Sequence, residues 1–259
     1  MFKPDAVLSI PFEITIAGIP LNIHLILEYL AFFSAYRYYV YLRKNRLDPI
    51  NHSNRLSIML GAALGAFLGS RLMGFLENPV LDISAVSFMQ LYNLKTIMGG
   101  LFGGLLGVEL AKRIIHEKNS SGDLFTLPII LGIFIGRIGC FLSGVNEFTY
   151  GTTTSFATGM DLGDGLKRHP IALYEILFLV LLFVFLRKLY LQNKFENGLL
   201  FKLFMVSYFG FRFLIEFIKP NAFFVLGLSS IQWLCIVCFV YYRKTLIHLP
   251  RAYAKVYLL

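Results

Sequence analysis

An arginine, a histidine and a glutamate lie beside or inside apolar runs in the middle of the chain. Arg137 stands in Gly-Arg-Ile-Gly-Cys-Phe-Leu-Ser-Gly at residues 136–144, and residues 169–175 read His-Pro-Ile-Ala-Leu-Tyr-Glu. A charge within a bilayer is costly, so such residues are usually kept for a function. A guanidinium can hold a phosphate through two parallel hydrogen bonds. These motifs predict a membrane-embedded site for an anionic head group, although an arginine snorkelling at the interface would also explain Arg137.

Two further pairs of ionisable residues have helical spacing. Arg212 and Glu216 are four residues apart, as are His24 and Glu28, so each pair shares one helix face. The first pair is either a buried ion pair that locks the bundle or a phosphate clamp in which the glutamate orients the arginine. The second pair could transfer a proton, because histidine titrates near neutral pH. Alternatively, it is a structural pair whose charges are balanced by a residue on another helix.

Other candidates for substrate binding flank these charges or lie where a helix is expected to begin. They are Gly99, Gly100, Gly136, Gly139, Cys140, His169, Tyr174, Glu175 and Lys95. The glycine-rich run 99–107 would let phosphate oxygens approach main-chain N–H groups, or it would let two helices pack closely. His169 precedes Pro170, so it either leads into a helix or borders the site. Asp161 and Asp164 could bind a metal, but a solvated turn explains them better.

The composition shows which elements must position these residues. Of the 259 residues, 57% are hydrophobic and 15% are charged, against about 25% charged in a soluble domain. This favours an all-α polytopic membrane protein built from about seven helices that are each long enough to span a bilayer. The expected spans are 22–42, 55–76, 96–116, 124–143, 170–189, 198–218 and 223–242. A single transmembrane domain over residues 1–259 follows.

The basic residues predict the orientation, because lysine and arginine favour cytoplasmic loops. They concentrate in the loops after the first, third and fifth spans and in the C-terminal tail. The C-terminus is therefore expected in the cytoplasm, and the N-terminus and a glycine-rich loop at about 144–169 outside. The net charge of +9 reflects these loops and does not indicate nucleic acid. No cleavable signal peptide is expected, because the first apolar segment is long and begins only near residue 19.

Small residues repeat every four positions in several expected helices, for example at Gly61, Gly65 and Gly69. This spacing favours close helix packing. Three cysteines cannot form a disulfide framework. Cys235 and Cys238 have a redox-like spacing, but inside an apolar span they are better read as inert packing. Glu109 and Arg71 are expected to pair with each other as a structural contact.

Four motifs in order resemble those of the prolipoprotein diacylglyceryl transferase family. They are Met-Gly-Gly-Leu-Phe-Gly-Gly-Leu-Leu-Gly at 98–107, Gly-Arg-Ile-Gly at 136–139, the His-Pro motif at 169–175, and Tyr-x-x-x-Arg-x-x-x-Glu-Phe at 208–217. The similarity covers roughly residues 20–245. It implies a bacterial inner-membrane enzyme, multi-pass, with its site toward the periplasmic side.

The resemblance also implies a reaction and roles for residues. Such an enzyme moves diacylglycerol from phosphatidylglycerol to the lipobox cysteine of a prolipoprotein signal peptide, and it needs no metal or organic cofactor. Arg137 and Arg212 would hold the lipid phosphate, and Glu216 would support Arg212. The outer mouth of the site would be shaped by His169, Tyr174 and Glu175.

The chain departs from the family pattern at three positions. Met98 stands where the family has a histidine before the first Gly-Gly pair, Cys140 stands where it has an asparagine, and Ile26 stands where it has a tyrosine. The segment after Cys140 also differs in length and in its acidic position. The half of the site that holds the lipid is thus retained, and much of the half that activates the thiol is changed.

These departures allow three interpretations of the function. The general base has moved to His24, Glu28 or Lys95, since what matters is a base within reach of the acceptor. Alternatively, the acceptor is a different nucleophile. In the third case the chain binds or transports phospholipid without catalysis.

Overall fold

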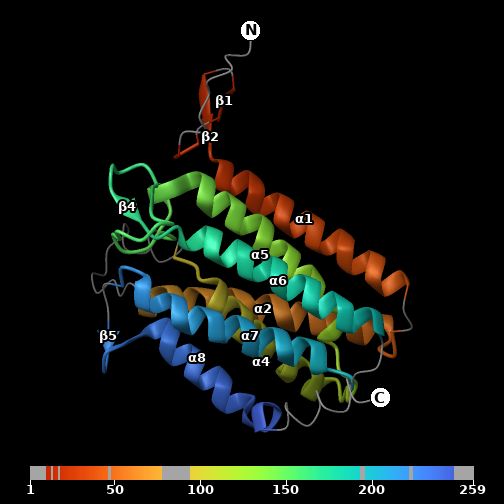
Figure 1. Ribbon diagram of the computed structural model, residues 1–259. Helices are drawn as coiled ribbons and strands as arrows, with labels where there is room; N and C mark the ends of the chain where they lie inside the picture. Colours follow the sequence, from red (N-terminus) through yellow and green to blue (C-terminus); the bar gives the residue numbers. More distant parts are fainter. Residues whose placement is uncertain are drawn as a thin grey trace, which may run out of the picture. The chain divides into compact units, whose positions relative to one another are not determined.

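The computed structural model describes residues 10–12, 14–16, 18–45, 48–77, 94–192, 196–221 and 224–247 (Figure 1). Most of these residues are α-helical, which confirms the expected all-α class. The helices are α1 (Ile23–Lys44), α2 (His52–Glu77), α4 (Ile97–Ile114), α5 (Asp123–Ser143), α6 (Ile171–Gln192), α7 (Leu199–Ile215) and α8 (Ser230–Tyr241). Two of the described helical segments, His52–Glu77 and Asp123–Asn146, are long and apolar enough to cross a membrane by length and composition.

Short antiparallel hairpins and single turns of 3-10 helix connect some of these helices. The hairpins pair β1 (Ile14–Ile16) with β2 (Ile19–Leu21), β3 (Met160–Asp161) with β4 (Lys167–Arg168), and β5 (Phe224–Val225) with β6 (Leu228–Ser229). The 3-10 turns are η1 (Gly144–Asn146) and η2 (Glu216–Ile218). The chain folds into two compact units, one built on α1, α5 and α6, and the other on α2, α4, α7 and α8.

In the first unit, α5 packs between α1 and α6 (Figure 1). Asn22 caps the start of α1 by accepting a hydrogen bond from the N–H of Leu25 at 3.1 Å. A small residue on α5 allows α1 to approach closely, since a Cβ added to Gly139 would lie 3.3 Å from the Cα of His24. The packing therefore places the start of α1 beside the last turns of α5.

The segment from 144 to 169 also belongs to this unit, and one carboxylate organises its turn at residues 161–165. Oδ1 of Asp161 accepts hydrogen bonds from the N–H groups of Gly163, Asp164 and Gly165 at 2.8, 3.1 and 3.0 Å. These bonds lower the pKa of Asp161, with the one from Gly163 first in effect. Gly163 and Gly165 have φ of 113° and 75°, which glycine adopts without strain. The expected solvated turn is confirmed and closes the β3–β4 hairpin.

In the second unit, the glycines of α2 and α4 bring two helix backbones into direct contact. A Cβ on Gly65 would lie 2.3 Å from the carbonyl oxygen of Gly103, and one on Gly69 would lie 2.4 Å from that of Gly99. Residues further along α2 therefore contact residues earlier in α4, so the two helices are antiparallel. The sequence-based prediction of close glycine packing is confirmed for this pair.

One helix end differs from the expectation. α8 begins at Ser230 and not near residue 223, because residues 224–229 form the β5–β6 hairpin. A capping box fixes the start: Ser229 Oγ accepts from the N–H of Gln232, and the Gln232 side chain accepts from the N–H of Ser229.

The basic residues used to predict orientation are only partly described. Arg55 is 1% exposed; its side chain pairs with Asp48 and donates to the carbonyl oxygen of Ser121 at 3.2 Å. Arg55, one of the basic residues after the first span, is therefore part of a buried ion pair. Five further basic residues used to predict the orientation lie outside the described residues: Lys3, Arg46, Lys194, Arg251 and Lys255.

Candidate active site

The central contact of the first unit is a buried ion pair between α5 and α6. Nε of Arg137 lies 2.8 Å from Oε1 of Glu175, and the two side chains are 8% and 0% exposed. Removing two charges from water is costly, and close approach in a medium of low polarity offsets that cost. The pair therefore fixes the guanidinium of Arg137 within an apolar helix interface.

A second group of polar side chains continues from Arg137 toward α1. Nη1 of Arg137 lies 3.6 Å from Sγ of Cys140, which in turn lies 4.0 Å from Nδ1 of His24. The same nitrogen of His24 lies 3.4 Å from Oε1 of Glu147, just beyond η1. A guanidinium, a thiol, an imidazole and a carboxylate thus follow one another. A guanidinium can bind phosphate and an imidazole can accept a proton, so this series has the groups that the predicted site requires.

The glycines around Arg137 have different surroundings. Gly139 faces α1 at His24, so a side chain there would push the two helices apart. A Cβ on Gly136 would meet nothing within 4 Å. The predicted role of Gly136 in binding therefore stays a prediction, since this space lies at Gly136 itself and the guanidinium of Arg137 is buried against Glu175. Glu28 is partly buried one turn along α1 from His24.

Two of the three predicted outer-mouth residues, His169 and Tyr174, are joined by a hydrogen bond. Nδ1 of His169 lies 3.1 Å from the hydroxyl of Tyr174, which also contacts Oγ1 of Thr158. Tyr174 thereby ties the 144–169 segment to the first turn of α6. Glu175, the next residue, faces Arg137 instead. One turn of α6 therefore positions both the loop and the arginine.

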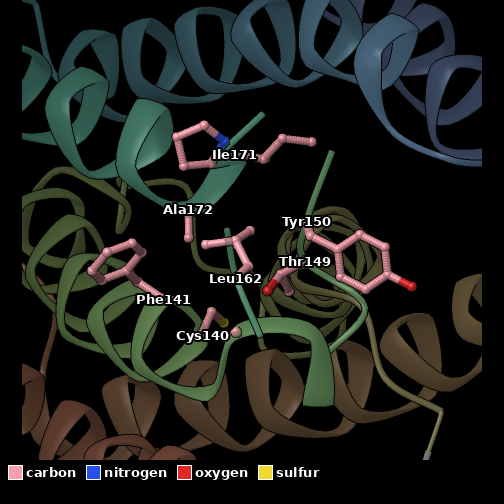
Figure 2. A pocket seen from close by; sticks show the side chains of 9 residues that line it. Cys140, Phe141, Thr149, Tyr150, Leu162, Ile171 and Ala172 are labelled. Atoms are coloured by element: carbon pink, nitrogen blue, oxygen red, sulfur yellow. The ribbon is translucent and has the colours of Figure 1, made fainter. Parts of the chain in front are cut away.

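A small pocket opens beside Cys140. Figure 2 shows Cys140 and Phe141 of α5 facing Ile171 and Ala172 of α6, with Leu162 between them. The remaining lining residues are Gly144, Thr149, Tyr150 and Pro170. The pocket is mostly apolar, with polar groups supplied by the segment that follows α5.

The second unit holds another buried arginine and glutamate. Nη2 of Arg212 lies 2.7 Å from Oε1 of Glu216, and both side chains are buried. Oε2 of Glu216 accepts a hydrogen bond from Oγ of Ser229 at 3.3 Å, and Gln232 donates to the carbonyl oxygen of Phe213. The expected ion pair exists, and the capping residue Ser229 holds its carboxylate.

The remaining predicted residues lie at the start of α4. The N–H groups of Gly99 and Gly100 donate to Oγ1 and the carbonyl oxygen of Thr96, at 3.1 and 3.0 Å. For Gly99 the structure favours helix packing over approach to a phosphate, because α2 lies directly against it. Lys95 is exposed, and Met98 is 2% exposed.

Comparison with known proteins identifies the family. The family model described as prolipoprotein diacylglyceryl transferase matches residues 11–247. The chain belongs to this family. Among similar proteins, one from Nitratidesulfovibrio vulgaris is 33% identical over 193 residues, covering 69% of this chain and 66% of the relative. The Bordetella bronchiseptica relative is 32% identical over 202 residues, covering 73% and 72%. The Idiomarina loihiensis relative is 31% identical over 229 residues, covering 80% and 81%.

All three relatives are named phosphatidylglycerol–prolipoprotein diacylglyceryl transferase. The chain spans slightly less than two thirds of the first one's length. Membership explains why the four motifs occur in order.

Sequence reasoning missed two groups that the structure places at these clusters. Glu147, which follows Arg137 by ten residues, lies beside His24. Its position at the end of a long apolar run could have identified it as a candidate site residue. Ser229 and Gln232 have the spacing of a capping box, which marks the start of α8. In the structure the Ser229 hydroxyl also donates to Glu216. Among the described residues, no three His, Cys, Asp or Glu side chains are grouped so as to hold a metal ion.

Proposed function

We propose that this chain transfers the diacylglyceryl group of phosphatidylglycerol to the cysteine thiol of a prolipoprotein signal peptide. Membership of the family and the names of its relatives support this reaction. The observation in the structure that carries it is the buried Arg137, held by Glu175 and followed by Cys140 and His24. A fixed cation beside a candidate base is what the reaction needs.

The reaction exchanges one bond at the glyceryl carbon. The acceptor sulfur bonds to that carbon, the bond from the carbon to the phosphate oxygen breaks, and glycerol phosphate leaves. The phosphate gains a negative charge as the bond breaks. Arg137 would bind the phosphate and stabilise that charge, which is the kind of electrostatic effect that usually dominates catalysis. Arg212, which pairs with Glu216, is proposed from its motif as a further phosphate-binding group.

His24 is the proposed base. Its Nδ1 lies 3.4 Å from Oε1 of Glu147, so the carboxylate can hold a proton on this nitrogen and stabilise the imidazolium that forms when Nε2 accepts a proton. The family's base position is occupied by the buried Met98, which has no proton-accepting group of suitable basicity. Glu28 and Lys95 are the alternative bases. Gly136 and Cys140 would border the lipid, whereas Gly139 packs against α1.

We also propose a seven-span arrangement in the bacterial inner membrane, with the N-terminus outside and the C-terminus in the cytoplasm. Exposed apolar side chains support a lipid-facing role for α2, since most of these residues recur three or four positions apart. They are Leu56, Leu60, Leu64, Phe67, Leu68, Leu72 and Leu76. The face bearing them differs from the glycine face that packs on α4. On this topology the 144–169 segment, with His169 and Tyr174, lies on the periplasmic side.

Mass spectrometry after incubation with phosphatidylglycerol and a lipobox peptide tests the reaction. The peptide should gain one diacylglyceryl group while glycerol phosphate is released. His24→Gln should lower kcat by about 10²–10⁴ with phosphatidylglycerol binding retained. His52→Gln changes an exposed histidine at the start of α2 and is the matched control.

Two results would redirect the proposal. An unchanged peptide with phosphatidylglycerol still bound would mean that the acceptor is different, or that the chain binds lipid without catalysis. Turnover and lipid binding that both survive Arg137→Ala would overturn the assignment of the phosphate site.

A further inference from the structure

The hydroxyl of Ser229 makes two different contacts in the second unit. Its oxygen accepts a hydrogen bond from the N–H of Gln232 at 3.1 Å, and its proton is donated to Oε2 of Glu216 at 3.3 Å. A helix cap needs only the acceptor, so the bond to Glu216 uses the part of the hydroxyl that capping leaves over. Ser229 is 2% exposed and Glu216 is 1% exposed, so water does not replace this donor.

Glu216 uses its two carboxylate oxygens for different partners. Oε1 lies 2.7 Å from Nη2 of Arg212, while Oε2 accepts from Ser229. Because a carboxylate is planar, a donor at Oε2 also fixes the direction of Oε1. The side-chain amide of Asn221 donates to the carbonyl oxygen of Glu216 at 3.0 Å. Glu216 is therefore held at its backbone and at the carboxylate oxygen that does not contact Arg212.

The capping box also joins α8 to the turn of α7 that carries Arg212. These two helices pack on each other (Figure 1). The side-chain amide of Gln232 donates to the carbonyl oxygen of Phe213, the residue after Arg212, at 3.2 Å, and its oxygen accepts from the N–H of Ser229 at 2.9 Å. The start of α8 thus holds Arg212 through its carboxylate partner and through the neighbouring backbone.

We propose that Ser229 is a positioning residue that orients the guanidinium of Arg212, through Glu216, toward the phosphate of the lipid donor. An arginine holds a phosphate through two parallel hydrogen bonds in a fixed geometry, so a change in its orientation weakens both. Ser229 itself does not touch the lipid. The inference rests on the proposed phosphate-binding role of Arg212 and not on the identity of the acceptor.

The next residue offers a matched comparison. Ser230 is 8% exposed, and its hydroxyl has no hydrogen-bond partner among the described residues. The two serines are therefore alike in type, burial and place in the chain, and they differ in their contact with Glu216. Ser230→Gly is the control for Ser229→Gly, a change that keeps most of the helix cap but removes the donor to Glu216.

The test measures binding of phosphatidylglycerol and of diacylglycerol to the full chain in detergent by native mass spectrometry. Ser229→Gly should lower the affinity for phosphatidylglycerol by about 10–100-fold, the order of one hydrogen bond to a charged group. Its affinity for diacylglycerol, which lacks the phosphate, should not change. Ser229→Thr keeps the hydroxyl and should retain the affinity for phosphatidylglycerol, as should Ser230→Gly.

Arg212→Ala shows whether the serine acts through the arginine. This variant should bind phosphatidylglycerol more weakly, and adding Ser229→Gly to it should cause no further loss. Additive losses would overturn the inference, as would a loss that extends to diacylglycerol or that Ser230→Gly shares. Binding that survives Arg212→Ala would overturn it together with the phosphate role of Arg212.

The same preparations separate this inference from the proposed transfer. Transfer by the unmodified chain to a lipobox peptide, with phosphatidylglycerol binding unchanged in Ser229→Gly, would overturn only the role of Ser229. An unchanged peptide, with the expected pattern of binding among the variants, would support the role of Ser229 and overturn only the transfer to that acceptor.

Discussion

The buried pair of Arg137 and Glu175 allows a quantitative prediction. At 2.8 Å two unit charges attract by roughly 6 kcal/mol at an effective dielectric constant of about 20, before desolvation is counted. Glu175→Gln keeps the size and a hydrogen-bond acceptor but removes the charge that balances Arg137. Breaking one side of such a pair typically costs about 3–5 kcal/mol, because a charge is left buried and unbalanced. We therefore expect the unfolding temperature of the purified protein to fall by on the order of 10 °C.

A double-mutant cycle separates the pair from the packing. Arg137→Gln and Glu175→Gln should each destabilise the protein, and the double variant should be more stable than the sum of the two losses implies, by about 2–3 kcal/mol. The assay is thermal or denaturant unfolding in detergent without anionic lipid. Losses that add to within about 0.5 kcal/mol would refute a strong charge interaction between these side chains.

Anionic lipid provides a second readout that ordinary packing would not affect. In Glu175→Gln the phosphate of phosphatidylglycerol should partly replace the missing carboxylate beside Arg137. Adding phosphatidylglycerol should therefore raise the unfolding temperature of this variant more than that of the unmodified protein, as expected for a ligand that binds the folded state. Phosphatidylcholine, at the same concentration, is the neutral control. An equal gain with both lipids would count against a phosphate at Arg137.

The other predictions concern packing and pH. Gly103→Ala should destabilise the protein by about 1–3 kcal/mol, because the new Cβ would lie 2.3 Å from the carbonyl oxygen of Gly65; thermal unfolding measures it. Gly210→Ala, with nothing within 4 Å, is the control, and an equal loss there would contradict the packing argument. Because its folded-state pKa is lowered below 3.8, Asp161 stabilises its turn above that pH, and the contribution is lost as pH falls through the folded pKa. The amide shift of Gly163, followed by NMR, should titrate below 3.8 and should not titrate in Asp161→Asn; a midpoint above that value would contradict it.

Local patterns in the sequence predicted the helices and one contact between them. The four-residue glycine spacing of α2 and α4 specified a face on which only backbone can approach backbone, and the structure places Gly65 against Gly103 there. Helix ends followed the apolar runs except at α8, where a hairpin precedes the capping residue Ser229. Apolar composition alone cannot separate a short hairpin from the first turns of a helix.

The site was harder to predict because its contacts join distant residues. Arg137 and Glu175 were each identified from their apolar surroundings, but nothing in the spacing of two helices says which of their faces meet. The contact between His24 and Cys140 depends on the approach of α1 to α5 at Gly139. Spacing along one helix suggested Glu28 as the partner of His24, whereas the structure also places His24 beside Cys140 of α5 and Glu147 just beyond η1.

The charges of the first unit suggest why a histidine suits the proposed reaction. Arg137 and Glu175 cancel, and Glu147 beside a neutral His24 leaves the group with one negative charge, which opposes a bound phosphate. When His24 accepts the thiol proton, the group becomes neutral at the moment when the departing phosphate gains its second negative charge. The arrangement is therefore more favourable to the transition state than to the bound lipid, which is the condition for raising kcat. A carboxylate base at the same place would end neutral instead of positive, but its negative charge beforehand would repel the phosphate more strongly and weaken lipid binding.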